Sequence, residues 1–142
     1  MDTPITPDLP GEWTMQFATG LGAWSLGDLW LDRANRRLAV RVTEPLCNAY
    51  GVMQGGAMAT LADVQSLAVR SYSGNEAEHT PTVSLSVDYL GPAPLGAWVI
   101  ADVTLLRTTR SLIFTQAVIT ADGAPAARAS AIYRNFTGKD AQ

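Results

Sequence analysis

The sequence predicts an α+β fold in which an antiparallel sheet wraps around one long central helix. Residues 55–72 place apolar side chains at nearly every angle of a helical wheel, and a helix that is apolar on every face is a buried helix. Two β-rich segments precede this helix and a longer run follows it, so the sheet must curl around the helix. With 142 residues, 47% of them hydrophobic, the chain has the size of one domain with a substantial core.

The composition excludes several classes of partner. A net charge of −3 and an isoelectric point near 4.9 disfavour nucleic acid, whose phosphates require a basic surface. Cys47 is the single cysteine, which excludes an internal disulfide and fits a reducing compartment. The N-terminus lacks the basic start and apolar run of a signal peptide, and no stretch is apolar enough to span a membrane. We therefore expect a cytoplasmic protein with neither a nucleic-acid nor a membrane partner.

The first residues of the chain predict a loose segment followed by a short helix. Residues 1–10 contain three prolines and are expected to lie loosely on the surface. Residues 12–22 predict a short helix, since Trp13, Phe17 and Leu21 recur at helical spacing. This stripe, with Trp24 beyond it, is interpreted as plain core, and an acyl pocket is the alternative.

The remaining β-rich segments predict the sheet. The predicted strands are residues 24–31 and 38–43 before the central helix, and residues 82–90, 97–106, 111–121 and a last segment from the turn at 122–123 to about residue 136 after it. On the last strand, Ala127, Ala129 and Ala131 share one face and are small enough for the helix to pack closely. No repeat or linker marks a second domain, so residues 11–142 are expected to form a single one.

Most catalytic arrangements are excluded by what the chain lacks. One His and one Cys cannot build a zinc site, so no metal is expected, and no Gly-x-Ser-x-Gly nucleophile elbow occurs. His79 lies in a polar loop and is interpreted as solvated, with a triad role as the alternative. Catalysis must then rest on carboxylates. Asp63 is the one acidic residue of the apolar helix, where a carboxylate loses hydration unless something compensates.

Several features resemble a known family when they are taken in chain order. They are Asn48, the pair Gly55-Gly56, Asp63, the segment Tyr-Leu-Gly-Pro-Ala at residues 89–93, and the Asp122-Gly123 turn. This set, spread over residues 12–136, resembles the hot-dog acyl-CoA thioesterases of the phenylacetate-pathway and 4-hydroxybenzoyl-CoA type. The resemblance implies a hot-dog fold and an enzyme that hydrolyses an acyl-CoA thioester to free acid and CoA. It implies no cofactor apart from the coenzyme A of the substrate.

The residues themselves are suited to this chemistry. A thiol with a pKa of about 8.5 leaves as the thiolate with little need of a proton, so a base and an oxyanion site are sufficient. Gly55 opens the helix, where free N–H groups and the positive end of the helix dipole point outward. Such donors stabilise the oxyanion that develops at a thioester carbonyl.

The resemblance also implies roles for single residues. Asn48 matches an amide that orients or polarises the thioester carbonyl, and the Gly55 N–H matches the oxyanion contact. Asp63 matches the acid that acts as general base on water, or as nucleophile through a mixed anhydride. Thr82 matches a hydroxyl that holds the water in one branch of the family. Ser66, three residues after Asp63 on the expected helix, is a second candidate hydroxyl.

Further residues are candidates for binding the substrate. Gln54 stands where the family usually has His; it can form hydrogen bonds but cannot titrate. Gly56 shares the loop-to-helix junction with Gln54. Arg107 and Arg110 are candidate contacts for the phosphates of coenzyme A, although charges on hairpin turns are more often only solvated.

Other interpretations remain open at this point. Asp63 could be a structural carboxylate paired with an Arg at an oligomer interface, and Asn48 could be only a turn residue. The replacement of His by Gln54 keeps a non-catalytic acyl-CoA-binding protein of the same fold as the alternative function. A hot-dog hydratase or dehydratase is disfavoured because those enzymes use a His together with an acid.

The spacing along the helix predicts a homo-oligomer. Gly55 and Asp63 are separated by eight residues, an axial rise of about 12 Å, so one helix cannot bring both to one carbonyl. A two-fold dimer with antiparallel helices, which the resemblance also implies, sets Asn48 and Gly55 of one chain opposite Asp63 and Thr82 of the other. A homotetramer built from two such homodimers is the larger assembly considered.

Overall fold

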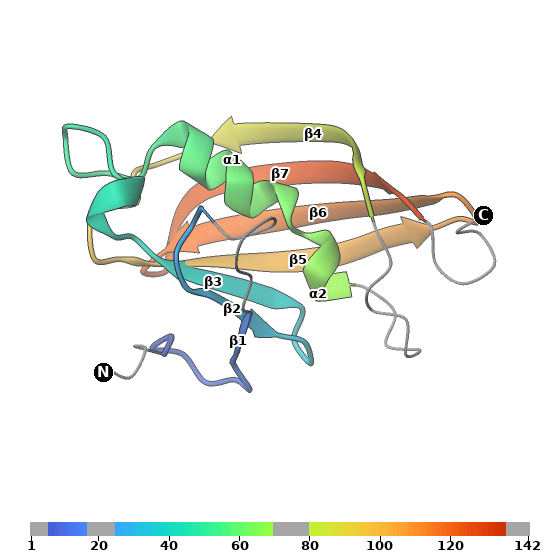
Figure 1. Cartoon of the computed structure of the whole chain (residues 1–142), viewed down its shortest axis with the longest axis horizontal. Coiled ribbons are helices and arrows are strands. Elements are labelled where there is room, and N and C mark those ends of the chain that lie inside the picture. The colour runs from blue at the N-terminus through green and yellow to red at the C-terminus, as the bar shows by residue number, and fades with distance from the viewer. Residues whose placement is uncertain (1–5, 17–24, 70–79, 136–142) are drawn as a thin grey trace.

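Seven antiparallel strands form one sheet, and the main helix lies across one of its faces (Figure 1). The computed structural model describes residues 6–16, 25–69 and 80–135. In chain order the elements are β1 (Thr14–Gln16), β2 (Leu29–Asp32), β3 (Arg37–Arg41), the 3₁₀ turn η1 (Glu44–Leu46), α1 (Gly55–Asp63), α2 (Ser66–Val69), β4 (Thr82–Tyr89), β5 (Trp98–Thr108), β6 (Leu112–Ala121) and β7 (Ala124–Arg134). Across the sheet the order is β1-β2-β3-β5-β6-β7-β4, so β1 and β4 are its edges. The predicted α+β hot-dog arrangement is confirmed.

The prediction of one continuous helix over residues 55–72 is wrong. α1 ends at Asp63, and a short α2 follows over Ser66–Val69, while residues 70–72 lie outside the described part. The buried Gln65 side chain explains the break. Its Nε2 donates to the Ala62 carbonyl at 2.9 Å, and it takes the place of the backbone N–H four residues later that would bind this carbonyl in a continuous helix. Asp63 is therefore the last residue of a helix rather than a mid-helix residue.

α1 is buried on one face only. Met58, Leu61 and Ala62 are buried, whereas Ala59 and Thr60 remain half-exposed within a single chain. A helix that is apolar all round but covered on one side leaves a face for a further contact. No helix in the described residues combines the length and the apolar character that crossing a membrane requires.

The small residues of the last strand let α1 lie close to the sheet. Ala127 and Ala129 of β7, with Ala117 of β6, are buried in the same hydrophobic cluster as Met58 and Leu61. Ala131, the third member of the predicted alanine face, is also buried, in a second cluster around Tyr133 and Ile113. The expectation drawn from these alanines is confirmed.

The predicted helix over residues 12–22 is wrong where the chain is described. Residues 14–16 form strand β1, which pairs with β2, and residues 17–24, including Phe17, Leu21 and Trp24, lie outside the described residues. Trp13 and Met15 pack against Trp30 and Ile100 on the face of the sheet away from α1. The hydrogen-bonded pairing of β1 with β2 and this apolar contact outweigh the local helical spacing. Because Trp13 lies on the face of the sheet away from α1, it does not belong to an acyl pocket beside α1.

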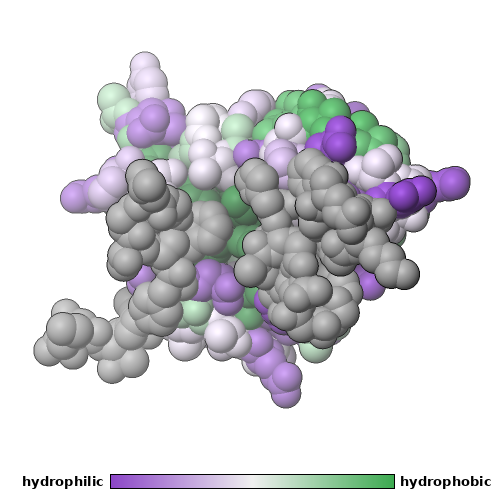
Figure 2. Space-filling view, turned by 45° about the vertical axis from the view of Figure 1, so that its right-hand side comes forward, coloured by the Kyte–Doolittle hydropathy of each residue, from purple (hydrophilic) through white to green (hydrophobic). Residues whose placement is uncertain are grey.

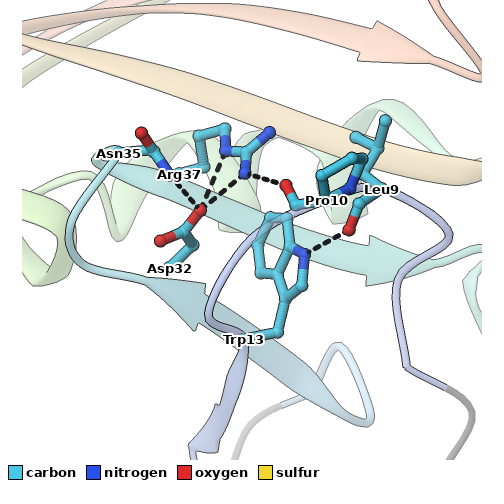
Figure 3. Close-up of polar contacts among 6 residues, drawn as sticks. All are labelled: Leu9, Pro10, Trp13, Asp32, Asn35 and Arg37. Carbon is cyan, nitrogen blue, oxygen red and sulfur yellow. Dashed lines mark hydrogen bonds and ion pairs between the residues drawn. The ribbon is translucent and has the colours of Figure 1, made fainter.

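The segment at residues 6–13 is attached to the outer face of the sheet, in contrast to the loose segment that its prolines predict. Figure 3 shows how it is held: the Arg37 guanidinium donates to the Pro10 carbonyl at 2.6 Å, and Trp13 Nε1 donates to the Leu9 carbonyl at 3.0 Å. Pro7 is buried as well. Residues 1–5 lie outside the described part.

Asp32 organises this attachment. Its carboxylate is fully buried and pairs with Arg37 at 2.6 Å, and Asn35 donates a further hydrogen bond at 2.8 Å (Figure 3). Burial by itself raises the pKa of Asp32, but the hydrogen bonds from Arg37 and Asn35 and the positive charge of Arg37 outweigh burial and hold this pKa below its ordinary value. The ionised pair therefore contributes to stability near neutral pH.

Asp32→Asn is expected to lower the free energy of unfolding by about 2 kcal/mol at pH 7, because Arg37 loses its charged partner. Since folding lowers the pKa of Asp32, its contribution is fully present above about pH 5 and is lost as the pH falls through 4 and below. Urea unfolding at several pH values should show the gap between wild type and variant narrowing toward pH 3. A gap that is absent at pH 7, or that does not narrow, would contradict this account.

Candidate active site

A tight turn before α1 carries Asn48. Its side-chain oxygen Oδ1 accepts hydrogen bonds from the backbone N–H of Tyr50 at 2.9 Å and of Val52 at 3.4 Å. Gly51 closes the turn with a φ of 74°, a conformation that favours glycine. Asn48 is therefore a turn residue, yet its side chain is exposed and its amide nitrogen Nδ2 makes no hydrogen bond within the described residues. The turn uses only the oxygen, so the nitrogen can still face a substrate.

Gln54 ties this loop to the residues before it. Its Nε2 donates to the Cys47 carbonyl at 3.0 Å, and its backbone N–H donates to the Leu46 carbonyl at 2.8 Å. Gln54 is the N-cap residue of α1, but its side chain does not cap the helix. The first helical amides, those of Gly55 and Gly56, have no intrahelical partner, and both glycines are exposed.

Tyr89, at the end of β4, covers the start of α1. Its hydroxyl donates to the Gly55 carbonyl oxygen at 2.7 Å. Its ring lies where a side chain at position 55 would project, 3.4 Å from the place of a Cβ atom. A Cβ atom at position 55 would be in ordinary van der Waals contact with this ring, so the ring lies directly beside the first residue of the helix.

Asp63, at the other end of α1, is half-buried and held from two strands. Thr82 Oγ1 donates to Asp63 Oδ1 at 2.7 Å, while Oδ2 makes no hydrogen bond within the described residues. The buried Tyr133 donates its hydroxyl to the backbone carbonyl of Asp63 at 2.8 Å. Because Thr82 and Tyr133 are paired across β4 and β7, neighbouring strands fix the carboxylate and the backbone of the same residue.

The hydroxyl of Tyr133 serves as a donor. Burial raises the pKa of this phenol and the negative charge of Asp63 raises it further, while the backbone amides of Ser66 and Gln65 partly oppose the rise. Tyr133 thus stays protonated well above neutral pH. Neither Tyr89 nor Tyr133 can be recognised as a site residue from strand alternation, which places a side chain on a face but not against a particular carbonyl.

Ser66 lies beyond the break, in α2, and is buried. Its Oγ accepts a hydrogen bond from Thr80 Oγ1 at 3.0 Å. Because α1 and α2 are not continuous, a spacing of three residues no longer places Ser66 one helical turn from Asp63. Thr82 is the hydroxyl that reaches the carboxylate, and Ser66 instead holds the segment that leads into β4.

The predicted residues form two groups at opposite ends of α1. Asn48, Gln54, Gly55 and Gly56 lie at its start, and Asp63, Thr82 and Ser66 lie at or beyond its end. Figure 1 shows β4 beside α1, and the contacts of Tyr89 with Gly55 and of Thr82 with Asp63 set the two elements in opposite directions. The ends are about 12 Å apart along the helix axis, so one chain does not bring the groups together.

Arg107 and Arg110 lie exposed at the hairpin that joins β5 and β6. In Figure 1 this hairpin is at the end of the sheet where α2 lies. Their contact with coenzyme A phosphates stays a prediction. His79 lies outside the described residues, and in the described ranges no group of three His, Cys, Asp or Glu side chains could hold a metal ion.

The chain matches known proteins at three levels. It is 29% identical over 102 residues to the Pseudomonas aeruginosa protein "Putative esterase PA0474", which covers 70% of this chain and 76% of that protein. The phenylacetic acid degradation protein PaaI from Thermus thermophilus superposes with a TM-score of 0.60 at 22% identity, covering 70% of this chain and 83% of that one. A hypothetical thioesterase from Streptococcus pneumoniae, solved with coenzyme A, superposes with a TM-score of 0.61 at 22% identity, covering 70% and 77%.

These two structural similarities establish the hot-dog fold, which agrees with the helix and the antiparallel sheet of this chain. A family model described as the thioesterase superfamily matches residues 50–126, more than half of the 142 residues. The matched range includes the start of α1, Asp63, Thr82 and Tyr89. The chain therefore belongs to the thioesterase superfamily and is a thioester hydrolase.

Proposed function

We propose that the chain hydrolyses acyl-CoA thioesters to a free acid and CoA, with Asp63 as general base or as nucleophile. The observation that carries this proposal is the placement of the Asp63 carboxylate. It is half-exposed at a helix end, Thr82 orients one oxygen, and the other oxygen has no hydrogen bond within the described residues. Membership of the superfamily supports the reaction, and the coenzyme A in the Streptococcus pneumoniae protein supports the substrate class.

The reaction requires stabilisation of a negative charge on the thioester oxygen. The exposed amides of Gly55 and Gly56 at the positive end of α1 are suited to this, at about 2.7–4 kcal/mol for each such donor. The Asn48 nitrogen supplies a further donor. Asp63 then either removes a proton from an attacking water or attacks the carbonyl itself to form a mixed anhydride, which water hydrolyses. Both routes release CoA as the thiolate, whose conjugate thiol has a pKa of about 8.5.

A site shared between two chains would unite the two groups, and the edge strand β4 supports this. In the sheet that the described residues form, β4 has a neighbouring strand on one side only, and the outer backbone groups of an edge strand form a template for another strand. Val83, Tyr89 and Leu90, on or just after β4, are 55%, 56% and 55% exposed. Figure 2 shows apolar surface along the upper edge of the molecule, the edge that β4 forms in Figure 1.

The direction of β4 relative to α1 makes such pairing productive. Antiparallel pairing of β4 with the same strand of a second copy places the Thr82 end of one chain against the Tyr89 end of the other. Because α1 packs beside β4, the two helices then also run antiparallel. Asp63 of one chain approaches Asn48 and Gly55 of its partner. A homotetramer of two such dimers, and a cytoplasmic location, stay predictions.

An assay of CoA release tests the proposal directly. Purified protein is incubated with a panel of aliphatic and aromatic acyl-CoA thioesters, and free thiol is measured against time. We expect release from at least one of them. Tight binding of acyl-CoA with no release would instead establish a non-catalytic acyl-CoA-binding protein.

Gln54→His is expected to leave kcat within about tenfold, or about 1.4 kcal/mol, of the wild-type value. The reason is that Gln54 ties the loop to the Cys47 carbonyl, and an imidazole N–H can make an equivalent hydrogen bond. The same thiol-release assay measures the effect. A gain of several orders of magnitude would show that position 54 does chemistry in this family and that the chain is a weakened enzyme.

A further inference from the structure

The contact between Tyr89 and Gly55 acts on one peptide group. The Tyr89 hydroxyl donates to the Gly55 carbonyl oxygen at 2.7 Å. That oxygen and the N–H of Gly56 belong to the same planar peptide unit, so a hydrogen bond to the one orients and polarises the other. Gly56 is exposed, and among the described residues no atom beyond its chain neighbours and its own stretch of helix lies within 4 Å of the place where its Cβ would stand. The polarised N–H thus belongs to a backbone that a ligand can approach closely.

Tyr89 is fixed to β7, the strand beside β4 in the sheet. It pairs with Ala127 of β7, and the next residue, Leu90, donates its N–H to the Ala126 carbonyl at 2.8 Å. Gly91 passes so close to the Pro125 carbonyl that a Cβ atom there would lie 2.7 Å from it. The hydroxyl of Tyr89 therefore extends from a rigid strand end rather than from a mobile loop.

We propose that Tyr89 is a positioning residue of the oxyanion site: it orients the Gly55–Gly56 peptide and strengthens the Gly56 N–H as a donor to the developing oxyanion. This inference rests on the proposed thioester hydrolysis and adds a residue and a second amide to it. The helix N-terminus by itself has no capping side chain, since Gln54 does not cap it. Tyr89 supplies the missing constraint from a strand 34 residues further along the chain.

Tyr89→Phe tests the inference because it keeps the ring over Gly55 and removes only the hydroxyl. Loss of one hydrogen bond of ordinary strength, felt mainly in the transition state, should lower kcat by about three- to tenfold. KM should stay within about twofold, since ground-state binding does not depend on the polarised amide. Thr104→Val is the control: it removes a hydroxyl from an exposed position of β5, away from α1 and from the turn that carries Asn48, and it should leave kcat unchanged.

An NMR measurement reads the contact without relying on turnover. In ¹⁵N–¹H spectra the Gly56 amide proton should move upfield in Tyr89→Phe and stay in place in Thr104→Val, because only the first change removes the donor to the Gly55 carbonyl. A melting temperature close to that of wild type completes the expected result. A purely packing role for Tyr89 would instead change the melting temperature and KM together and leave the Gly56 resonance where it was.

Each contrary result has a distinct meaning. If the wild type is active and the kcat of Tyr89→Phe lies within twofold of the wild-type value, this inference alone is overturned. An unmoved Gly56 resonance in Tyr89→Phe has the same meaning. A wild-type chain that releases no CoA from any thioester overturns the proposed function and this inference with it. A fall in activity of equal size in Thr104→Val also overturns the inference, because the effect would then not depend on the Gly55 contact.

Discussion

Replacing Asp63 by Asn is expected to lower kcat by about 10²–10⁴-fold, the contribution that a positioned general base typically makes. Asn is nearly isosteric with Asp and its Oδ1 can still accept the Thr82 hydrogen bond, so the end of α1 should keep its geometry. The amide cannot remove a proton from water and cannot form a mixed anhydride. The loss should appear in kcat, measured by thiol release, with binding of the CoA product unchanged.

Asp102→Asn is the control for this change. Asp102 is exposed on β5, and replacing it removes one negative charge without touching α1 or β4. It should hydrolyse acyl-CoA at the wild-type rate. If Asp63→Asn retained more than about a third of the wild-type kcat, Asp63 would be neither base nor nucleophile, and the structural interpretation of this carboxylate would replace the catalytic one.

Mixing two inactive variants is expected to restore activity if the site is shared. Asn48→Asp keeps the oxygen that accepts from Tyr50 and Val52 but removes the amide donor, so it should inactivate the site while preserving the turn. Asp63→Asn inactivates the other half. After joint denaturation and refolding about half of the dimers are mixed, and each carries one intact site of two. About a quarter of the wild-type activity should return.

Two controls make the mixing experiment decisive. Each variant refolded alone must stay inactive, and differently tagged chains must show that mixed dimers formed. Mixed dimers without activity would mean that the two ends of α1 do not meet across a dimer, and Asp63 would then serve its own chain. A mixture that regains the expected quarter supports the antiparallel pairing of β4.

Local patterns predicted most of the sheet and the start of α1. β3, β4, β5, β6 and β7 lie where alternating residues predict them, and α1 begins at Gly55 as the glycine pair predicts. Alternation and loop signals act over a few residues, so they can be read from the chain itself. The predictions for two strands with less regular patterns were less accurate. β2 begins only at Leu29, and β1 occupies residues that were predicted as helix.

The sequence by itself determined the fold class and the candidate chemistry, namely a glycine-opened helix, one carboxylate on it and a hydroxyl at Thr82. Only the tertiary structure decided where the helix ends and what holds its two ends. Tyr133 binds the Asp63 carbonyl from 70 residues away and Tyr89 binds the Gly55 carbonyl from 34 residues away. Helix ends depend on which group satisfies their free backbone atoms, and here those groups come from strands that become neighbours only after the chain has folded.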